Sequence, residues 1–397
     1  MRSINEEINL NDKKILLRLD LNVPLINGKI TDTTRIDKIL PTLKFLIQQN
    51  SKVIILSHVG RPNGKIVNEL SLKPICKVLG NKLNQDIKLI TKNINEINNE
   101  NLFKNIDEKI VMLENIRFYF EEEKNDPEFA RHLASLADIY VNDAFSCSHR
   151  SHASIHEISN FLPSYSGLQL DLEVKALTKI TTEIKKPVTC IIGGSKISTK
   201  INIIKNLIPR FNNIIIVGGM ANNIIKYMGH NIGKSLQEEN SDLVIKEIFS
   251  LSKIKNCKIL YPQDIVVAKD LGGSPQIKAI NEISSNEMIL DIGPKTIKNI
   301  ISLIDESKTI LWNGPAGYFE NPSFANGSIK IAEKIIQNNI ANKIYSVAGG
   351  GDTVSLLSSL NAINNFNFVS TAGGAFLEYL EGKELPGIKA LNKNVRT

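Results

Sequence analysis

Short runs of β-branched and aliphatic residues alternate with segments of helical spacing along the whole chain. In the first half, the predicted strands are residues 14–19, 53–57, 110–113 and 139–142. Between them, one helix is predicted from the spacing of Ile36, Leu40, Leu43 and Ile47, and another from the N-cap pair Asp126-Pro127. Repeated β-α units of this kind are typical of a parallel sheet covered by helices.

The segment 170–184 is predicted to be one charged helix that connects two domains. Leu170, Val174, Leu177 and Thr178 share one face of it, and Lys185-Lys186-Pro187 stops it. Beyond it the alternation starts again, at residues 188–192, 213–217, 258–260, 265–267, 288–290, 309–312, 343–347 and 367–370. These runs predict a second sheet of about six strands.

A chain of 397 residues is long enough for two domains with sizeable cores. Apolar residues make up 42% and charged residues 22%, which excludes a mainly disordered or collagen-like chain. No apolar run approaches the roughly 20 residues that cross a bilayer, and no secretory signal is visible, so a cytoplasmic location is expected. The four cysteines lie far apart, which predicts free thiols rather than a zinc knuckle, a redox motif or a disulfide scaffold.

The net charge of +7 is compatible with nucleic acid, an anionic membrane or small acidic substrates. The distribution of residues favours small acidic substrates. Seven of the nine arginines lie in residues 1–198, and seventeen of the twenty-four glycines lie in residues 199–397. Arginine suits bidentate capture of phosphate or carboxylate, and glycine lets a backbone approach a ligand closely. A nucleic-acid-binding protein is the alternative from another class, although clustered basic runs are missing and aromatic residues make up only 6%.

Polar clusters follow the predicted strands of the first half, at the strand ends where open parallel sheets bind ligands. If these loops converge, they line a pocket with Asp20, Asn22, Arg35, His58, Arg61, Arg117 and Arg150. The arginines indicate a small multiply charged anion, and Asp20 and Asn22 would accept hydrogen bonds from its hydroxyl groups. The alternatives are surface ion pairs for the arginines and an Asx turn before Pro24. The pattern predicts a phosphorylated polyol or hydroxy acid as ligand.

Three histidines, His149, His152 and His156, have the spacing of a metal site on one helix. No cysteine or acidic residue completes an obvious ligand set. We therefore expect Ser151, Ser154 and His152 to be capping and packing groups around Arg150.

Two glycine-bearing turns follow predicted strands in the second half. In residues 193–200, backbone N–H groups and two lysines four apart, Lys196 and Lys200, are predicted to cradle a phosphate; the alternative is a plain strand-to-helix turn with surface lysines. In residues 349–353, Asp352 adds a carboxylate for Mg²⁺, and Glu320 in the turn 312–320 is a candidate for gripping a ribose. A Gly-x-Gly-x-x-Gly motif, a complete P-loop and a hydrolase elbow are missing, which argues against a dinucleotide dehydrogenase, a P-loop kinase and a Ser-His-Asp hydrolase.

Seven segments, in this order, closely resemble the phosphoglycerate kinase family over essentially the whole chain: residues 18–24, 57–62, 142–154, 193–200, 291–296, 309–320 and 349–353. Pattern and resemblance together predict an α/β fold of two Rossmann-like domains, each a parallel sheet covered by helices on both faces, joined by a hinge helix. The 3-phosphoglycerate-binding domain would be residues 1–168, the hinge helix 169–186, and the nucleotide-binding domain 187–375. Residues 376–397 would return to the first domain.

The resemblance implies reversible transfer of the acyl phosphate of 1,3-bisphosphoglycerate to Mg-ADP, which yields 3-phosphoglycerate and ATP. The carboxylate of one substrate attacks the terminal phosphorus of the other in line, without a covalent enzyme intermediate, in a cleft closed by hinge motion. A monomer that binds neither nucleic acid nor membrane is expected. A phosphotransferase for another phosphorylated acid is the nearest enzymatic alternative.

The resemblance also assigns roles to individual residues. It implies that 3-phosphoglycerate is held by Asp20, Asn22, Arg35, His58, Arg61, Arg117 and Arg150. It implies that the nucleotide is held by Lys196, Lys200, Gly218, Gly219, Gly293, Asn313, Glu320, Gly349, Gly350, Gly351, Asp352 and Thr353, with Asp352 on Mg²⁺. The implied catalytic groups are Arg35, Lys196, Lys200 and the amides of Gly350 and Gly351. Two departures from the family pattern are Tyr261-Pro262-Gln263-Asp264, where Leu-Pro-Val-Asp is usual, and Ala372, where glycine is usual.

Overall fold

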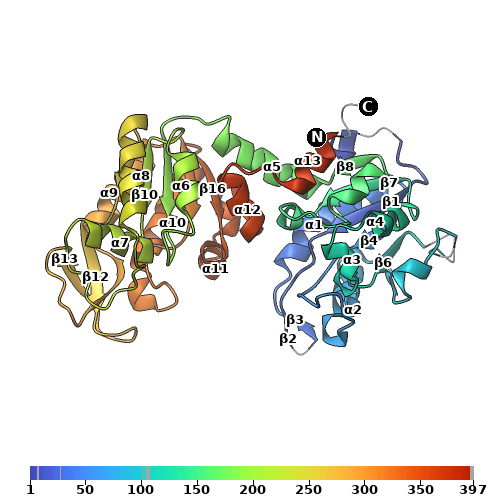
Figure 1. The fold of residues 1–397 in the computed structure, drawn as a ribbon, viewed down its shortest axis with the longest axis horizontal. Helices are drawn as coiled ribbons and strands as arrows, with labels where there is room; N and C mark the ends of the chain where they lie inside the picture. The colour runs from blue at the N-terminus through green and yellow to red at the C-terminus, as the bar shows by residue number, and fades with distance from the viewer. Residues whose placement is uncertain (7–8, 27, 101, 104–107, 394–397) are drawn as a thin grey trace. The chain divides into compact units, whose positions relative to one another are not determined.

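The chain folds into two units, each built on its own six-stranded parallel sheet (Figure 1). Unit 1 contains Met1–Val174 and Glu384–Thr397, and unit 2 contains Lys175–Lys383. The boundary falls inside helix α5 (Leu168–Thr181). The computed structural model describes residues 1–6, 9–26, 28–100, 102–103 and 108–393.

The sheet of unit 1 has the strand order β5-β6-β4-β1-β7-β8. Its strands are β1 (Lys14–Leu19), β4 (Lys52–Leu56), β5 (Lys88–Ile90), β6 (Ile110–Leu113), β7 (Ile139–Asp143) and β8 (Ser164–Ser166). A small antiparallel pair is formed by β2 (Leu25–Ile26) and β3 (Lys29–Ile30). The helices of this unit are α1 (Thr34–Gln48), α2 (Lys73–Leu83), α3 (Phe120–Glu123), α4 (Pro127–Ala134) and α13 (Pro386–Lys393). Its 3-10 helices are η1 (Ile4–Glu6), η2 (Asn68–Leu70), η3 (Ile94–Glu96), η4 (Ile116–Phe118), η5 (Phe145–Cys147) and η6 (Glu157–Asn160).

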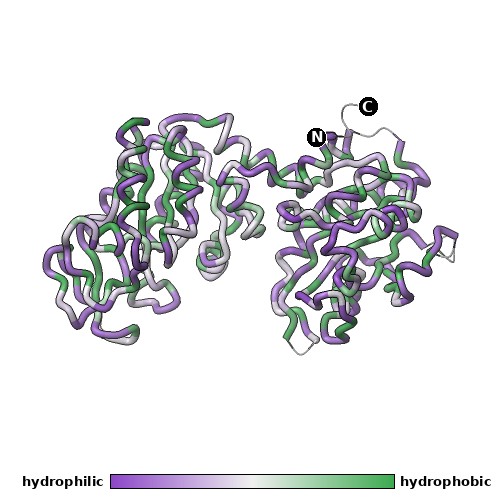
Figure 2. The backbone as a smooth tube through the Cα atoms, viewed as in Figure 1, coloured by the Kyte–Doolittle hydropathy of each residue, from purple (hydrophilic) through white to green (hydrophobic). Residues whose placement is uncertain are grey.

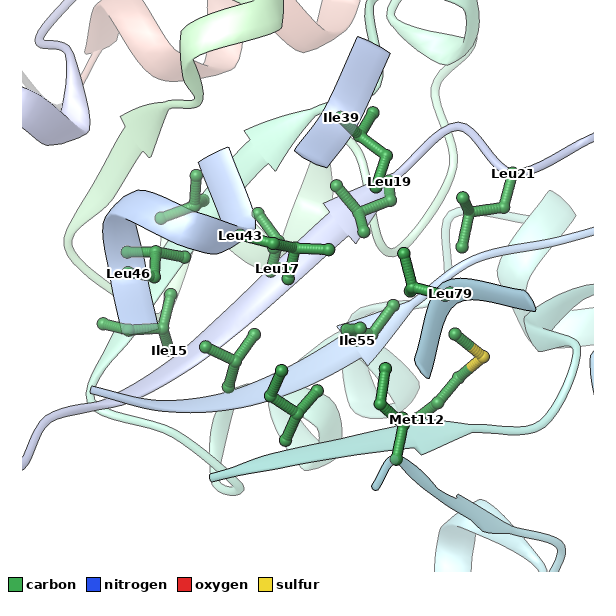
Figure 3. Close-up of a cluster of buried hydrophobic side chains, with 14 of the residues drawn as sticks. Ile15, Leu17, Leu19, Leu21, Ile39, Leu43, Leu46, Ile55, Leu79 and Met112 are labelled. Carbon is green, nitrogen blue, oxygen red and sulfur yellow. The ribbon is translucent and has the colours of Figure 1, made fainter. Parts of the chain in front are cut away.

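Both faces of this sheet are covered. Successive residues of a strand point to opposite faces, yet five of the six residues of β1 are buried. On one face, Ile15, Leu17 and Leu19 of β1 lie in one cluster with side chains of α1 and α2, which Figure 3 shows as Ile39, Leu43, Leu46 and Leu79. Removal of these side chains from water is the main force that holds the helices on the sheet. Figure 2 shows the underlying alternation of hydrophobic and hydrophilic stretches along both units.

The last helix of the chain belongs to unit 1. The N–H of Gly387 donates to the carbonyl oxygen of Ser148 at 2.8 Å, and Ala390 and Leu391 are buried. Gly387 allows this approach, because a Cβ there would lie 2.9 Å from Ser148 Oγ and from a methyl carbon of Ile155. In Figure 1, α13 (red) accordingly lies beside β8.

The main sheet of unit 2 has the order β11-β10-β9-β15-β16-β17. Its strands are β9 (Val188–Ile192), β10 (Asn213–Ile216), β11 (Lys258–Leu260), β15 (Thr309–Asn313), β16 (Tyr345–Gly349) and β17 (Phe368–Ser370). Its helices are α6 (Ile201–Leu207), α7 (Gly219–Tyr227), α8 (Asp242–Lys255), α9 (Pro294–Glu306), α10 (Asn326–Ile340), α11 (Gly351–Ser359) and α12 (Gly373–Leu380), with the 3-10 helices η7 (Pro322–Phe324) and η8 (Ile363–Asn365). Every residue of β9 and β15 is buried, so helices cover both faces here too.

Two of the strands predicted for the second half lie outside the parallel sheet. Residues 265–267 and 288–290 belong to β12 (Asp264–Ala268) and β14 (Met288–Ile292), which form a separate antiparallel sheet with β13 (Gln276–Ala279). A short apolar run indicates a strand but carries no information about its partner or its direction. The predicted count of about six strands in the parallel sheet is nevertheless confirmed.

The predicted α/β fold with two Rossmann-like sheets is confirmed. Numbered in chain order, the strands of unit 2 run 3-2-1-4-5-6, which is the Rossmann order, and those of unit 1 run 3-4-2-1-5-6. The connecting helix ends at Thr181, three residues before the predicted end. The four cysteines are free, as predicted, and all four are buried. In the described part of the chain, no helix has the length and apolar character needed to span a membrane.

Candidate active site

The strand order of unit 1 brings the predicted anion-binding residues to one edge of its sheet. Strands β6, β4, β1 and β7 are neighbours and parallel, so the loops that follow them leave from the same edge. The order of the strands reverses between β1 and β7, and ligands of open α/β sheets bind at such a switch point. A hydrogen bond joins the loops on the two sides of this switch point: Ser146 Oγ donates to Asp20 Oδ2 at 2.6 Å.

Asp20 is linked directly to Arg35. Nη1 of Arg35, at the start of α1, donates to both carboxylate oxygens of Asp20, at 2.9 and 3.0 Å. Asp20 Oδ1 also accepts the backbone N–H of Asn22, so the Asx turn considered for Asn22 is made by Asp20 instead. The carboxylate therefore fixes both the loop and the arginine.

A second chain of contacts joins Asn22 to Arg117. Asn22 Oδ1 accepts the N–H of Gly60, and the carbonyl oxygen of Gly60 accepts from Nη1 of Arg117 at 3.1 Å. Gly60 has a φ of +66°, a conformation that favours glycine. Burial lowers the pKa of Arg117, and the nearby cations Arg18 and Arg150 act in the same direction. A bound anion would relieve that electrostatic penalty.

His58 is buried on the loop after β4, and its Nδ1 lies 3.0 Å from Nη2 of Arg18. Burial, followed by the charges of Arg18 and Arg117, holds the pKa of His58 well below its usual value. His58 is therefore a neutral group at physiological pH. The remaining predicted residues, Arg61 and Arg150, are exposed at the same edge, and neither side chain has a hydrogen bond or ion pair with any described residue.

The segment around Arg150 contains the three histidines and Ser154. His149, His152 and His156 lie outside any helix, and no group of three or more metal-ligating side chains is found among the described residues. The hydrogen bonds of Ser154 go to other residues: its Oγ accepts from Nε of Arg18 and donates to Glu122. His152 is buried beside the same carboxylate, with Nδ1 3.8 Å from Oε1.

Unit 2 contains a pocket of ≈ 390 Å³ beyond the carboxyl ends of β9, β10 and β15. The order of the strands reverses between β9 and β15, so this pocket also lies at a switch point. Of the residues predicted to bind nucleotide, four line it: Gly218, Gly219, Glu320 and Asp352. The rest of the lining is largely apolar and includes Leu236, Met288, Leu290, Tyr318 and Phe319. This lining can accept a flat apolar group such as a base.

Glycines form the floor of this pocket, where Gly194, Gly218, Gly219 and Gly317 are among the lining residues, and two backbones cross beneath them. A Cβ on Gly193 would lie 2.4 Å from the carbonyl oxygen of Pro315, and one on Gly314 would lie 2.4 Å from the carbonyl oxygen of Gly193. Gly314 also has a φ of +108°. Gly218, with a φ of +63°, precedes α7 and donates its N–H to the carbonyl oxygen of Ala316.

The two predicted lysines do not share a helical face, because α6 begins only at Ile201. Lys196 is exposed, whereas Lys200 turns inward, where its Nζ donates to the carbonyl oxygen of Gly193 at 2.6 Å and to Oδ1 of Asn313. Burial lowers the pKa of Lys200 to about 8, and the nearby carboxylate of Asp352 opposes this shift. The inward lysine is thus a cation that gives up its proton readily.

Other predicted nucleotide residues form the frame of the pocket rather than its lining. Asn313 Nδ2 donates to the carbonyl oxygen of Gly349, and Thr353 Oγ1 accepts from the N–H of Gly314 at 2.7 Å. Gly350 has a φ of +97°, and a Cβ there would lie 2.5 Å from Nδ2 of Asn313. Gly351 begins α11. Gly293 lies against Asp264, whose carboxylate accepts from the first turn of α9, and it is not among the lining residues.

Sequence reasoning missed a buried carboxylate in the pocket lining, Asp291 of β14. It accepts N–H groups from Ile292 and Gly327, and burial raises its pKa to about 7. Reasoning also missed Ser146, which positions Asp20. Both residues lie in segments that resemble the family, at 291–296 and 142–154, but the pattern gave no role to either, because the contacts with Gly327 and Asp20 join residues that are distant in the chain.

The residues of unit 2 fit a magnesium ion that arrives with a nucleotide. Mg²⁺ is usually bound through one or two carboxylates together with substrate phosphates, rather than by an all-protein cage. Asp352 supplies one exposed carboxylate at the pocket edge, in the first turn of α11. Asp352 would hold the ion, which would supply charge neutralisation on the phosphates.

Two Rossmann-like sheets, one bearing an arginine cluster and the other a glycine-floored pocket at a switch point, have the features of a phosphotransferase. Residues 5–383 match the family model described as phosphoglycerate kinase. The chain belongs to the phosphoglycerate kinase family and is a phosphotransferase of that glycolytic family.

Individual relatives are similar to this chain over almost its whole length. Phosphoglycerate kinase of Wolbachia pipientis wMel is 44% identical over 98% of both chains, and that of Methylorubrum extorquens (strain PA1) is 41% identical with the same coverage. The solved structure of phosphoglycerate kinase from Coxiella burnetii is similar with a TM-score of 0.90, at 38% identity over 98% of both chains. That from Pyrococcus horikoshii OT3 is similar with a TM-score of 0.83, at 26% identity over all of both chains.

Proposed function

We propose that the chain transfers the acyl phosphate of 1,3-bisphosphoglycerate to Mg-ADP, reversibly, with formation of 3-phosphoglycerate and ATP. One observation carries the proposal: residues that the family resemblance assigns to the phosphoglycerate lie at the switch point of unit 1, where Arg35 binds Asp20 and Arg117 is fixed through Gly60 to Asn22. This set of groups suits a small molecule with a phosphate, a carboxyl group and a hydroxyl group.

Unit 1 would bind the phosphoglycerate. Arg61 and Arg150 lack protein partners among the described residues, so they are available for its phosphate. Arg117 is buried and its pKa is lowered by burial, so an anion stabilises its charge. Asp20 and Asn22 are acceptors for the hydroxyl group, and Arg35 lies beside them as the cation nearest the reacting carboxyl.

Unit 2 would bind the nucleotide. The apolar pocket lining accepts the base, and Glu320 at its edge accepts hydrogen bonds from the ribose. Lys196, Lys200 and the amides of Gly350 and Gly351 surround the phosphates, and Asp352 holds the magnesium ion that accompanies them. The three successive glycines let the backbone approach the phosphates closely.

The reaction needs no covalent enzyme intermediate. A carboxylate oxygen of 3-phosphoglycerate attacks the γ-phosphorus of ATP in line while the bond to the ADP oxygen breaks, and the reverse reaction follows the same path. Arg35, Lys196, Lys200 and the glycine amides stabilise the charge on the transferred group. We further propose that the units close about α5 when both substrates are bound, because water would otherwise hydrolyse the ATP or the acyl phosphate.

The proposal is tested by an assay in which the purified chain receives 3-phosphoglycerate, ATP and Mg²⁺, and the product is coupled to NADH oxidation. We expect a rate that requires all three components and that falls by orders of magnitude in Arg35→Ala. A rate no higher than that of Arg35→Ala would refute the proposal. Competition by other phosphorylated acids separates it from a phosphotransferase of different specificity.

A further inference from the structure

One cation of unit 1 lies behind the proposed phosphoglycerate site rather than in it. Arg18, on β1, is fully buried. Its Nε donates to Ser154 Oγ at 3.0 Å, its Nη1 donates to the carbonyl oxygen of Leu19, and its Nη2 lies 3.0 Å from Nδ1 of His58. A fully buried guanidinium is rare unless its donors are used, and here each of its three nitrogens has a partner.

The direction of each hydrogen bond follows from the chemistry of the groups. A guanidinium only donates, so Nδ1 of His58 must accept and cannot carry a proton. Ser154 Oγ accepts from Arg18 and therefore donates to Glu122, at 2.7 Å from Oε1. Donation thus runs outward from the guanidinium on both sides, to the imidazole on one side and through the hydroxyl to the buried carboxylate on the other.

We propose that Arg18 is a positioning residue that holds His58 in the tautomer with its proton on Nε2, so that His58 offers a neutral N–H donor to the phosphorylated acid. The identity of that ligand rests on the proposed function; the tautomer does not. No hydrogen bond joins Nε2 of His58 to any residue in the described part of the chain. Nδ1 faces Arg18 and the Cys147 sulfur, at 3.0 and 4.0 Å, so Nε2 is on the opposite side of the ring.

The electrostatic surroundings favour a neutral donor over an imidazolium. Burial opposes a positive charge on the ring of His58 most strongly, followed by Arg18 of β1, Arg117 of η4, His152 and Arg35 of α1. Cys147 of η5 also faces the ring, but burial raises the pKa of its thiol, so it adds no negative charge there. A second cation there would need compensation, whereas a neutral N–H adds a hydrogen bond to the ligand without adding charge.

Glu122 completes the arrangement, because it is the buried negative charge opposite Arg18. It is fully buried, accepts the N–H and the hydroxyl of Ser154, and has no direct ion pair with Arg18 in the described structure. The hydroxyl of Ser154 therefore transmits the orientation of the carboxylate to the guanidinium. This predicts that the guanidinium is fixed in rotation as well as in place.

The tautomer of His58 is measured directly by ¹⁵N NMR of the intact, ligand-free chain labelled at histidine, because protonated and unprotonated ring nitrogens have well-separated shifts. The chain has six histidines, and the signal of His58 is assigned by its loss in His58→Gln. We expect one neutral form with the proton on Nε2. A proton on Nδ1, or an equal mixture of tautomers, would overturn the proposal.

Arg18→Met removes the donors but keeps a long apolar side chain, so His58 should become a mixture of tautomers. The KM for 3-phosphoglycerate should then rise about tenfold, with a smaller change in kcat and none in the KM for ATP. Arg18→Lys, which keeps one donor group, should restore much of the Nε2–H form. An unchanged single tautomer in Arg18→Met would contradict the positioning role.

Because Arg18→Met leaves Glu122 as an uncompensated buried charge, a second variant guards against misfolding. Arg18→Met/Glu122→Gln removes both charges, and we expect the same mixture of tautomers in it.

A separate pair of variants tests the donor itself: His58→Gln can present an amide N–H near the position of Nε2, whereas His58→Asn cannot. Equal KM values for these two variants would count against a donor at Nε2. If the assay with 3-phosphoglycerate failed while the NMR result held, the proposed substrate alone would be refuted.

Discussion

At the scale of single residues, the surroundings of Lys200 bring its pKa close to physiological pH. Its Nζ is partly buried beneath the pocket floor and donates to Gly193 and Asn313, and burial lowers its pKa to about 8. The lysine must be protonated to stabilise the charge of a transferred phosphoryl group. Its pKa lies so close to physiological pH that activity should depend on this proton.

We predict that kcat/KM for the nucleotide falls as the pH rises through about 8, because the free enzyme then loses the cation at Lys200. Lys200→Arg keeps its charge at all these pH values, so its lower activity should no longer show this fall. Lys196→Arg is the matched control and should retain it. The measurement is the pH profile of the coupled assay, and an identical alkaline fall in Lys200→Arg would contradict the assignment.

The site residues differ in how far the sequence could predict them. Arg35, Arg61 and Arg117 were predictable because parallel strands bring their loops to one edge whatever the details of packing. The partners of Arg18 were not, since Ser154 lies 136 residues away in the chain and its contact depends on the side-chain arrangement of the folded core. The inward turn of Lys200 was missed for the same reason.

At the scale of elements, the start of α5 is held by a buried carboxylate. Asp143 Oδ1, at the end of β7, accepts the N–H of Leu170 at 2.9 Å, while Oδ2 is buried without a hydrogen-bond partner in the described structure. Gly167 makes room for it, because a Cβ there would lie 2.3 Å from the carboxyl carbon. Burial raises the pKa of Asp143 to about 6.

This raised pKa gives Asp143 a definite effect on stability. Its contribution is fully present below the ordinary carboxyl pKa of 3.8 and is lost as the pH rises through about 6, because the folded state then holds a buried charge. Asp143→Asn cannot ionise and keeps the acceptor for Leu170. The difference in free energy of unfolding between Asp143→Asn and the wild type should therefore shift in favour of the variant by on the order of 2 kcal/mol when the pH is raised from about 4 to about 8.

The free energy of unfolding of each protein is measured at both pH values by urea unfolding, with circular dichroism as the signal. The wild type at the lower pH is its own control, because Asp143 is then protonated and resembles asparagine. A difference between the two proteins that does not change with pH would show that the carboxyl group ionises normally in the folded state.

The crossing of two backbones in unit 2 sets a strict requirement for glycine. Gly314→Ala places a Cβ 2.4 Å from the carbonyl oxygen of Gly193, at a φ of +108°. We expect a loss of about 2–4 kcal/mol in free energy of unfolding, from backbone strain and overpacking together. Gly373→Ala is the matched control, since nothing lies within 4 Å of its Cβ position, and it should change stability little. Thermal unfolding of both variants tests this, and equal melting temperatures would refute it.

Most elements were predictable from apolar spacing because burial dictates that spacing. The helix with Pro41 in its interior is present as α1, and Asp126 does cap α4 by accepting the N–H of Phe129. The antiparallel sheet was missed because strand pairing depends on which edges are free in the folded unit. Ala372, where the family usually has glycine, has a φ of −94° as the N-cap of α12, so alanine is accommodated without left-handed strain.

At the scale of the whole molecule, the uneven distribution of arginine and glycine follows the division into units. The arginine cluster lies at the switch point of unit 1, and the glycine-floored pocket lies at that of unit 2. In the proposed function, the same parallel architecture serves two kinds of ligand, because the loops rather than the sheets carry the chemistry. Direct transfer requires that both ligands meet.

Closure about α5 predicts a change in the dimensions of the molecule in solution. Small-angle X-ray scattering should detect a smaller radius of gyration when 3-phosphoglycerate and a nonreactive Mg-nucleotide are both present, and little change with either alone. Arg35→Ala with both ligands is the control that keeps the nucleotide site intact. The same radius of gyration in every ligand state would refute closure.

The most direct test of the central claim is calorimetric titration of the intact chain with 3-phosphoglycerate and with Mg-ADP, compared among the wild type, Arg61→Ala and Lys196→Ala. The account predicts that Arg61→Ala weakens 3-phosphoglycerate binding about tenfold or more and leaves Mg-ADP binding unchanged, because the residue acts in unit 1 alone. It predicts that Lys196→Ala leaves 3-phosphoglycerate binding unchanged. Selective loss of 3-phosphoglycerate binding in Lys196→Ala, or of Mg-ADP binding in Arg61→Ala, would contradict the assignment of one substrate to each unit.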